Sequence, residues 1–172
     1  MRAAILTISD RCSRGEAEDR AGPAVGEELG AAGVEVVEIA VTSDDRERIQ
    51  AELLRLSDDV GVDVVFTSGG TGLGPRDVTP EATEAVLDRR APGIAEAMRV
   101  RSLDRTPAAM LSRGTAGLRA RTLIVNLPGS PRGARECLAV VLPVLAHAVE
   151  MIAGSGHGPE ASGYGGSGAG PT

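Results

Sequence analysis

A glycine-rich segment behind an apolar run is the feature that most constrains what this chain can fold into. The apolar run, residues 62–67, predicts a buried strand, and the sequence SGGTGLGPRDVTPE fills residues 68–81 directly after it. Glycine lets backbone N–H groups approach an anion with no Cβ in the way. A helix capped by Thr79, with Pro80 at its first position, would add further free donors. The segment therefore predicts a strand, a phosphate-binding loop and a helix in succession.

Arg76 and Asp77 add charge to the same loop. An arginine guanidinium can contact two phosphate oxygens at once, and an aspartate supplies the hard oxygen ligand that magnesium prefers. A tight turn in front of a capped helix is the alternative interpretation. The clustering of several glycines with an Arg-Asp pair favours the phosphate site over that alternative.

Apolar and amphipathic segments alternate along the rest of the chain. The hydrophobic pattern predicts strands at residues 2–8, 34–41, 62–67 and 121–126 and helices at residues 22–32, 44–60, 79–90, 93–103 and 132–153. Strands that alternate with helices in this way indicate right-handed crossovers and a parallel sheet. The predicted fold is a single three-layer α/β domain, with a mostly parallel sheet covered by helices on both faces.

The remaining segments set the limits of this domain. Residues 9–20 read as a loop and residues 108–118 as helix or turn, and Pro143 is expected to kink or divide the last helix. A chain of 172 residues has room for one such domain, which we assign to residues 1–153. Residues 154–172 contain mostly Gly, Ser, Pro and Ala without periodicity, and they predict a disordered tail.

Four loops with polar residues follow predicted strands: Ser9-Asp10, residues 42–44, the glycine-rich loop and residues 126–130. Ligands of parallel sheets collect at the carboxyl ends of the strands, so the four loops could face one crevice. Each loop also has a simpler explanation. Asp44 with Glu47 fits a capping box, Ser9 and Asp10 could be ordinary loop hydrogen-bonding residues, and residues 126–130 could form a tight turn.

Composition excludes several classes of function. The net charge is −6 and no arginine-rich block appears, so binding to a nucleic-acid backbone is not expected. Phe66 and Tyr164 are the only aromatic residues, which removes the stacking platform of single-strand binders. All 18 basic residues are arginine. The absence of lysine rules out a P-loop NTPase and Schiff-base chemistry.

The cysteines and the N-terminus indicate the compartment. Cys12 and Cys137 form no Cys-x-x-Cys pair, and neither histidine stands in ligand spacing with them, so a zinc site is not expected. Unpaired thiols suit a reducing compartment. The apolar run at residues 3–8 is too short for a signal peptide or a membrane span. We therefore expect a cytoplasmic protein that does not bind a membrane.

Five segments of the chain, in the same order, resemble the molybdenum cofactor biosynthesis domain of the MogA/MoaB type, which also occurs in gephyrin and in the plant molybdopterin adenylyltransferase. The segments are LTISD (6–10), VTSDD (41–45), SGGTGLGPRDVTPE (68–81), MLSR (110–113) and NLPGSP (126–131). The resemblance covers about residues 1–153. It implies adenylyl transfer, in which the terminal phosphate of molybdopterin attacks the α-phosphorus of Mg-ATP and pyrophosphate leaves.

The resemblance, together with the loop chemistry, assigns roles to individual residues. Asp44 and Asp77 are the expected catalytic residues and magnesium ligands. The expected nucleotide- and phosphate-binding residues are Ser9, Asp10, Gly69, Gly70, Thr71, Gly72, Arg76 and Thr79. The expected molybdopterin-binding residues are Ser112, Asn126, Gly129 and Ser130. The cofactor is then Mg²⁺, with ATP as co-substrate.

The resemblance also implies partners and leaves alternatives open. A homotrimer is implied, with residues 139–152 as a candidate interface that could equally be a core helix, and the product could pass to a molybdenum insertase. Ser43 stands where the family often has proline, which leaves Asp45 as a possible substitute for Asp44. A non-catalytic molybdopterin carrier of the MoaB type and an enzyme that cleaves a nucleotide pyrophosphate are the rival functions. Because Arg76 and Asp77 are both present, the sequence favours the active transferase.

Overall fold

The computed structural model describes residues 1–154, and the predicted tail lies outside the described residues apart from Gly154. Six strands form one sheet in the order β2-β1-β3-β6-β5-β4. Their bounds are β1 Arg2–Ile8, β2 Glu35–Thr42, β3 Val64–Ser68, β4 Arg89–Arg90, β5 Ala116–Arg119 and β6 Thr122–Leu127. The first four strands in this order are parallel, and β5 and β4 continue the sheet antiparallel. The prediction of a mostly parallel α/β sheet is confirmed.

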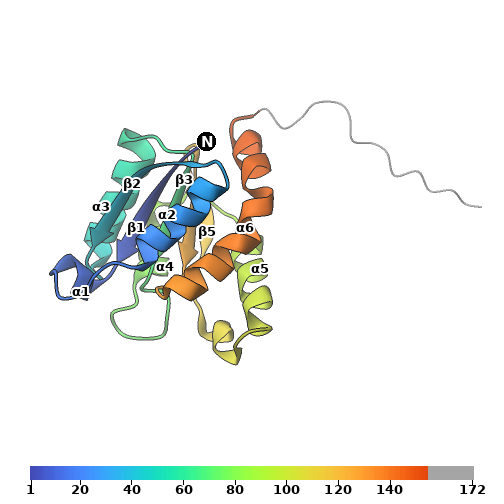
Figure 1. Ribbon diagram of the computed structural model, residues 1–172. Coiled ribbons are helices and arrows are strands. Elements are labelled where there is room, and N and C mark those ends of the chain that lie inside the picture. The colour runs from blue at the N-terminus through green and yellow to red at the C-terminus, as the bar shows by residue number, and fades with distance from the viewer. Residues whose placement is uncertain (155–172) are drawn as a thin grey trace, which may run out of the picture.

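Helices cover both faces of the sheet, as predicted (Figure 1). Their bounds are α1 Asp10–Ser13, α2 Ala21–Ala31, α3 Arg46–Leu54, α4 Thr79–Val86, α5 Pro92–Leu103 and α6 Pro131–Ile152, with a π-helix at Arg55–Asp59 and a 3₁₀ helix at Pro107–Leu111. Successive strand residues point to opposite faces. Ile5 and Phe66 therefore pack with α2, α5 and α6, whereas Leu6 and Val65 pack with α3 and α4.

The register of the parallel strands brings four loops to one edge of the sheet. Ile8 of β1 pairs with Thr42 of β2, and Ser68 of β3 pairs with Leu127 of β6. The chain leaves all four strands at the same level, in the lower part of Figure 1, where α1 and the loop before α4 lie. The loops predicted to face one crevice are therefore neighbours.

Two short strands were not predicted, β5 and the edge strand β4 beside it. The expected helix at residues 79–90 ends at Val86, and the expected helix or turn at residues 108–118 is a 3₁₀ helix followed by β5. Strand β4 is only two residues long and pairs with β5. A Cβ on Gly117 would come within 2.5 Å of the Arg89 carbonyl oxygen, so this pairing needs a glycine. Such strands are stabilised by tertiary pairing and leave no periodic signal in the sequence.

One predicted helix boundary and one predicted loop are wrong for local reasons. The helix predicted at 44–60 begins at Arg46, because Asp45 and not Asp44 is its cap and accepts a hydrogen bond from the Arg48 N–H at 3.0 Å. The predicted loop at 9–20 contains α1, whose cap Ser9 accepts from the Cys12 N–H at 3.2 Å. Asp44 is thereby left free of a capping role.

Helix α6 is continuous through Pro143 and is not divided there. Within residues 1–154, none of the helices combines the length and the apolar character needed to cross a membrane.

Candidate active site

The site is built from the loops after β1, β2, β3 and β6. The loops after β1 and β2 are joined by Asp10 and Asp44, whose backbones and side chains exchange hydrogen bonds. The Asp10 N–H donates to Asp44 Oδ2 at 2.8 Å, and the Asp44 N–H donates to Asp10 Oδ1 at 3.1 Å. The Ser9 N–H adds a bond to the Thr42 carbonyl oxygen at 2.9 Å. The two loops therefore hold each other in place.

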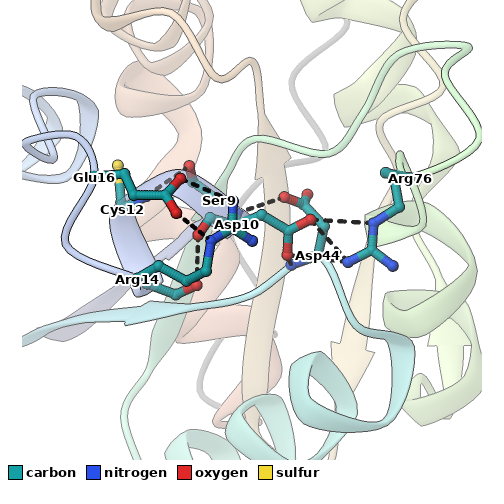
Figure 2. A network of polar contacts seen from close by, with 8 residues as sticks. Ser9, Asp10, Cys12, Arg14, Glu16, Asp44 and Arg76 are labelled. Carbon is teal, nitrogen blue, oxygen red and sulfur yellow. Dashed lines mark hydrogen bonds and ion pairs between the residues drawn. The ribbon is translucent and has the colours of Figure 1, made fainter.

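Arg76 reaches across from the glycine-rich loop to the Asp10 carboxylate (Figure 2). Its Nε donates to Asp10 Oδ2 at 3.1 Å, and its Nη2 lies 3.0 and 2.8 Å from the two carboxylate oxygens. The Arg76 side chain is 63% exposed, so solvent screens this pair. Nη1 of Arg76 donates to no residue in the part of the chain that the structure describes.

The two aspartates differ in their electrostatics. The hydrogen bonds from Arg76 lower the pKa of Asp10. Burial raises the pKa of Asp44, and the nearby charges of Asp10 and Asp77 act in the same direction, against the smaller opposing effects of the Asp10 N–H and the Arg76 charge. Asp44 is therefore a carboxylate whose charge is poorly compensated by the protein, which is a common property of groups that bind a cation or act in chemistry.

Two positions of the glycine-rich loop can be occupied only by glycine. Gly69 and Gly70 have φ angles of +107° and +63°. A Cβ on Gly69 would collide with the Ile8 carbonyl oxygen, and one on Gly70 would collide with the Thr79 hydroxyl and lie 3.2 Å from Asp44 Oδ1. These close approaches bring the loop against β1 and against Asp44.

Thr79 is not the helix cap that the sequence suggested. It is the first residue of α4, follows Val78 and is fully buried. Its hydroxyl donates to the Gly69 carbonyl oxygen at 2.9 Å, and its N–H donates to the Gly70 carbonyl oxygen at 3.1 Å. Thr79 therefore fixes the shape of the loop from behind.

Three consecutive predicted site residues of this loop carry backbone donors without a partner within residues 1–154. They are the backbone N–H groups of Gly70, Thr71 and Gly72. Backbone donors without a protein acceptor at the end of a parallel strand are the elements of an anion site.

Asp77 closes the loop on itself. Its Oδ2 accepts from the Gly74 N–H at 2.8 Å, and its own N–H donates to the Gly74 carbonyl oxygen at 3.0 Å. A Cβ on Gly72 or Gly74 would lie within 3 Å of Asp77 Oδ2, so a side chain at either position would displace the carboxylate from its observed place. Among the described residues, Asp77 Oδ1 accepts no hydrogen bond.

Two cavities open on either side of these loops. The first has a volume of about 430 Å³, and the second a volume of about 290 Å³. The predicted site residues that line the first are Ser9, Asp44, Gly69, Gly70, Asp77 and Gly129. The predicted site residues that line the second are Thr71, Gly72, Ser112, Asn126 and Ser130. Asp10, Arg76 and Thr79 line neither cavity but hold the loops between them.

Asn126 lies in the wall of the second cavity, and both polar atoms of its side chain are hydrogen-bonded within the protein. Its Nδ2 donates to the hydroxyls of Thr67 and Thr83, both at 2.9 Å, and its Oδ1 accepts from the Thr115 N–H at 3.2 Å. The residue is 2% exposed. Asn126 therefore ties the end of β6 to its neighbours and has little capacity left for a ligand.

Two arginines of the site were missed by the sequence reasoning. Arg99 of α5 lines the second cavity and donates to the Gly114 carbonyl oxygen at 2.9 Å. Arg113 donates to carbonyl oxygens of the glycine-rich loop. The only signal for Arg113 is its place in the MLSR segment, and Arg99 has none, because hydrogen bonds to distant carbonyl groups leave no pattern in the sequence.

Fold and site together define an α/β protein with a glycine-rich loop at the carboxyl edge of the parallel part of its sheet. The sequence matches the family described as "Probable molybdopterin binding domain" over residues 4–147. The chain belongs to this family.

Relatives and solved structures agree with the assignment. A protein of Helicobacter pylori called molybdopterin adenylyltransferase is 42% identical over 153 residues, which are 88% of this chain and 87% of that protein. Gephyrin of Dictyostelium discoideum is 43% identical over 161 residues, and the match spans 86% of this chain but 22% of gephyrin. The crystal structure of the molybdopterin biosynthesis enzyme MoaB from Thermus thermophilus is 51% identical and superimposes with a TM-score of 0.84, covering 89% of this chain and 96% of that one.

Proposed function

We propose that this protein is a molybdopterin adenylyltransferase, which transfers AMP from ATP to the terminal phosphate of molybdopterin and releases pyrophosphate. The observation that carries the proposal is the pair of cavities that meet at the glycine-rich loop. A reaction that joins two large substrates through phosphate needs two adjacent pockets with anion-binding groups between them. The names of the similar proteins support the same activity.

The first cavity is the proposed nucleotide site. Gly70 lines this cavity, and its free N–H would donate to a phosphate oxygen of ATP. The free N–H groups of Thr71 and Gly72, which line the second cavity, would bind phosphate where the two cavities meet. Arg76 keeps Nη1 for a further phosphate contact while Asp10 orients its guanidinium. In this proposal Ser9 and Gly129 line the same pocket, and Thr79 acts by shaping the loop.

Asp44 and Asp77 fit the requirements of a magnesium ion held partly by the nucleotide. Each carboxylate has one oxygen that accepts no hydrogen bond from the described residues, Oδ1 in both cases. No group of three or more His, Cys, Asp or Glu side chains within residues 1–154 could hold a metal by itself. Magnesium commonly takes one or two carboxylates together with substrate phosphates. When bound, it would neutralise charge on the triphosphate and the departing pyrophosphate.

The second cavity is the proposed molybdopterin site. Its walls are mainly apolar, and Ser112, Ser130 and Arg99 contribute polar groups. The Ser130 hydroxyl caps α6 by accepting from the Gly133 N–H at 3.1 Å, and its proton is available to a ligand oxygen. Asn126 would give this pocket its shape, whereas Gly129, which was predicted to contact molybdopterin, lines the first cavity.

The chemistry is an in-line displacement at phosphorus. An oxygen of the molybdopterin phosphate forms a bond to the α-phosphorus of ATP, and the bond from that phosphorus to the bridging oxygen of the β-phosphate breaks. Positioning and charge neutralisation supply most of the catalysis in such reactions. The backbone donors at residues 70–72 and Arg76 provide both without a protein nucleophile.

Product analysis tests this function against its rivals. The protein is incubated with ATP labelled at the α-phosphate, magnesium and molybdopterin, and the products are separated by chromatography. We expect the label in a pterin-containing product. Label that remains in ATP while the pterin stays bound would indicate a carrier, and label in free AMP without a pterin acceptor would indicate a hydrolase.

We further propose a cytoplasmic homotrimer that passes its product to a molybdenum insertase. Val144 and Met151 on the outer side of α6 are each 52% exposed, and they support an interface on this helix. Light scattering on the purified protein should give three times the mass of the chain, and a monomeric mass would contradict the trimer.

A further inference from the structure

Arg113 donates three hydrogen bonds to the glycine-rich loop and one to helix α4, which follows the loop. Its backbone N–H donates to the Thr71 carbonyl oxygen at 2.9 Å, and its Nε donates to the Gly72 carbonyl oxygen at 2.7 Å. Its Nη2 donates to the Asp77 carbonyl oxygen, and its Nη1 pairs with Glu81 of α4. One side chain therefore holds both ends of the segment from Gly72 to Asp77.

Three different nitrogens of the guanidinium serve three different acceptors. A planar fork with donors on Nε, Nη1 and Nη2 can do this, whereas a lysine ammonium is a single point with no fixed directions. The side chain of Arg113 is 34% exposed, so its contribution comes from geometry and only partly from charge. The identity of this residue is thus set by the shape of the loop.

The segment that carries Arg113 is itself held from the second cavity. Nη1 of Arg99 donates to the Gly114 carbonyl oxygen at 2.9 Å and lies 3.4 Å from the Ser112 carbonyl oxygen. These two residues flank Arg113 in the chain. A continuous path of hydrogen bonds therefore runs from the wall of the second cavity through Arg113 to the backbone of Asp77.

We propose that Arg113 is a positioning residue that fixes the Asp77 carboxylate relative to the loop donors at residues 70–72. It touches no substrate in this proposal and acts through the carbonyl groups of Gly72 and Asp77. The catalytic part of the inference rests on the proposed function, because it assumes that Asp77 serves adenylyl transfer.

Amide hydrogen exchange tests the positioning role without any substrate. In the full-length protein labelled with ¹⁵N, exchange is measured at the Gly74 and Asp77 amides, whose hydrogen bonds close the turn. In Arg113→Lys we expect both amides to exchange about tenfold faster, as for the loss of one net hydrogen bond, while the Ile5 amide in β1 is unchanged. Equal protection in wild type and variant would overturn the proposal, as would a wild type with no protection at these amides.

Arg119→Lys is the matched control. Arg119 is 31% exposed and forms a similar forked pair with Asp58, with Nη2 at 2.7 Å from Oδ2, away from both cavities. The Arg119→Lys variant should leave the exchange rates of the Gly74 and Asp77 amides at their wild-type values. If Arg113→Lys fails to fold, Glu81→Gln is the second variant, because it weakens the ion pair between Arg113 and Glu81 from the Glu81 side. Unchanged exchange of the Gly74 amide in Glu81→Gln would then overturn the proposal.

Kinetics then separate positioning from binding. We expect Arg113→Lys to lower kcat for adenylyl transfer about 100-fold, since small displacements of a positioned group have effects of that size, and to change KM for molybdopterin less than about threefold. A normal kcat would overturn the positioning role. If the wild type itself transfers no AMP, the proposed function is wrong, and the exchange experiment still decides the role of Arg113.

Discussion

Asp10 and Asp44 exchange two hydrogen bonds, from the Asp10 N–H to Asp44 Oδ2 at 2.8 Å and from the Asp44 N–H to Asp10 Oδ1 at 3.1 Å. Each residue follows a different strand, so the pair fixes two loops of the site at once. Only Asp10 also receives a guanidinium, from Arg76. The two carboxylates therefore share a backbone arrangement but differ in charge compensation, which has consequences that can be measured.

The pKa values of these two aspartates should lie on opposite sides of the ordinary value of about 3.9. Hydrogen bonds from Arg76 lower the pKa of Asp10, and burial raises that of Asp44. Asp10 then stabilises the fold above pH 3.9, and this contribution is lost as the pH falls through its lowered pKa. The pH dependence for Asp44 runs the other way: its contribution to folding stability is present at low pH and is lost as the pH rises through its raised pKa. Carboxyl ¹³C titration by NMR measures both.

The control for that titration is Arg76→Gln. This variant should move the Asp10 pKa back up, and the Asp44 pKa should stay above 3.9. Identical Asp10 titration curves in wild type and Arg76→Gln would contradict the assigned cause.

Asp44→Asn should separate stability from activity. The change removes a carboxylate whose ionised form is disfavoured by burial, so the thermal midpoint at pH 7 should equal or exceed that of the wild type. Adenylyl transfer should fall by about 10²-fold or more, because a proposed magnesium ligand is lost. A variant with a lowered midpoint and normal turnover would reverse both parts of the prediction.

Gly70→Ala should lower the free energy of unfolding by more than the positive φ angle at this position alone would explain. Gly33→Ala is the matched control, since Gly33 has a similar φ of +77° but has no atom within 4 Å of an added Cβ. We expect the control to lose about 1 kcal/mol of unfolding free energy and Gly70→Ala to lose about 3 kcal/mol, because its methyl group would collide with Thr79. Denaturant unfolding measures both, and equal losses would show that the close approach at Gly70 carries no cost.

Asn126→Ala should behave as a core mutation and not as the loss of a ligand contact. It leaves the Thr115 N–H and two buried threonine hydroxyls without their partner, at a cost of about 3 kcal/mol of unfolding free energy. In the free protein, Ser130→Ala removes a helix cap and should cost about 1 kcal/mol of unfolding free energy. If Asn126→Ala retained wild-type stability and weakened only molybdopterin binding, its polar atoms would have to face the ligand.

The parallel part of the sheet was predictable because its strands are uninterrupted apolar runs. The observed bounds of β1, β2, β3 and β6 lie within two residues of the predicted ones. Strands β4 and β5 were missed because runs of two and four residues are too short to show a hydrophobic period. Their existence depends on pairing with distant residues.

The site was predictable as a set of loops but not in its internal roles. The strand-end rule brought together Ser9, Asp44 and the glycine-rich loop. Ser9, Asp44 and part of the loop line one cavity, and the rest of the loop lines the other. From the sequence, Asp44 fitted the capping box of α3, whereas Asp45 is the observed cap, because the helix begins one residue later than the capping-box spacing suggested. The sequence also could not reveal that the side chains of Thr79, Asn126 and Arg113 form hydrogen bonds with other parts of the chain.

The measurement that tests the central claim most directly is pyrophosphate release from Mg-ATP, with and without freshly prepared molybdopterin, in wild type and Asp77→Asn. Asp77 lies in a cavity wall, so the variant should keep its fold. We predict release that requires molybdopterin, magnesium and Asp77 together. Molybdopterin binding without pyrophosphate release by the wild type, or release by Asp77→Asn at the wild-type rate, would contradict the proposed transferase and its site.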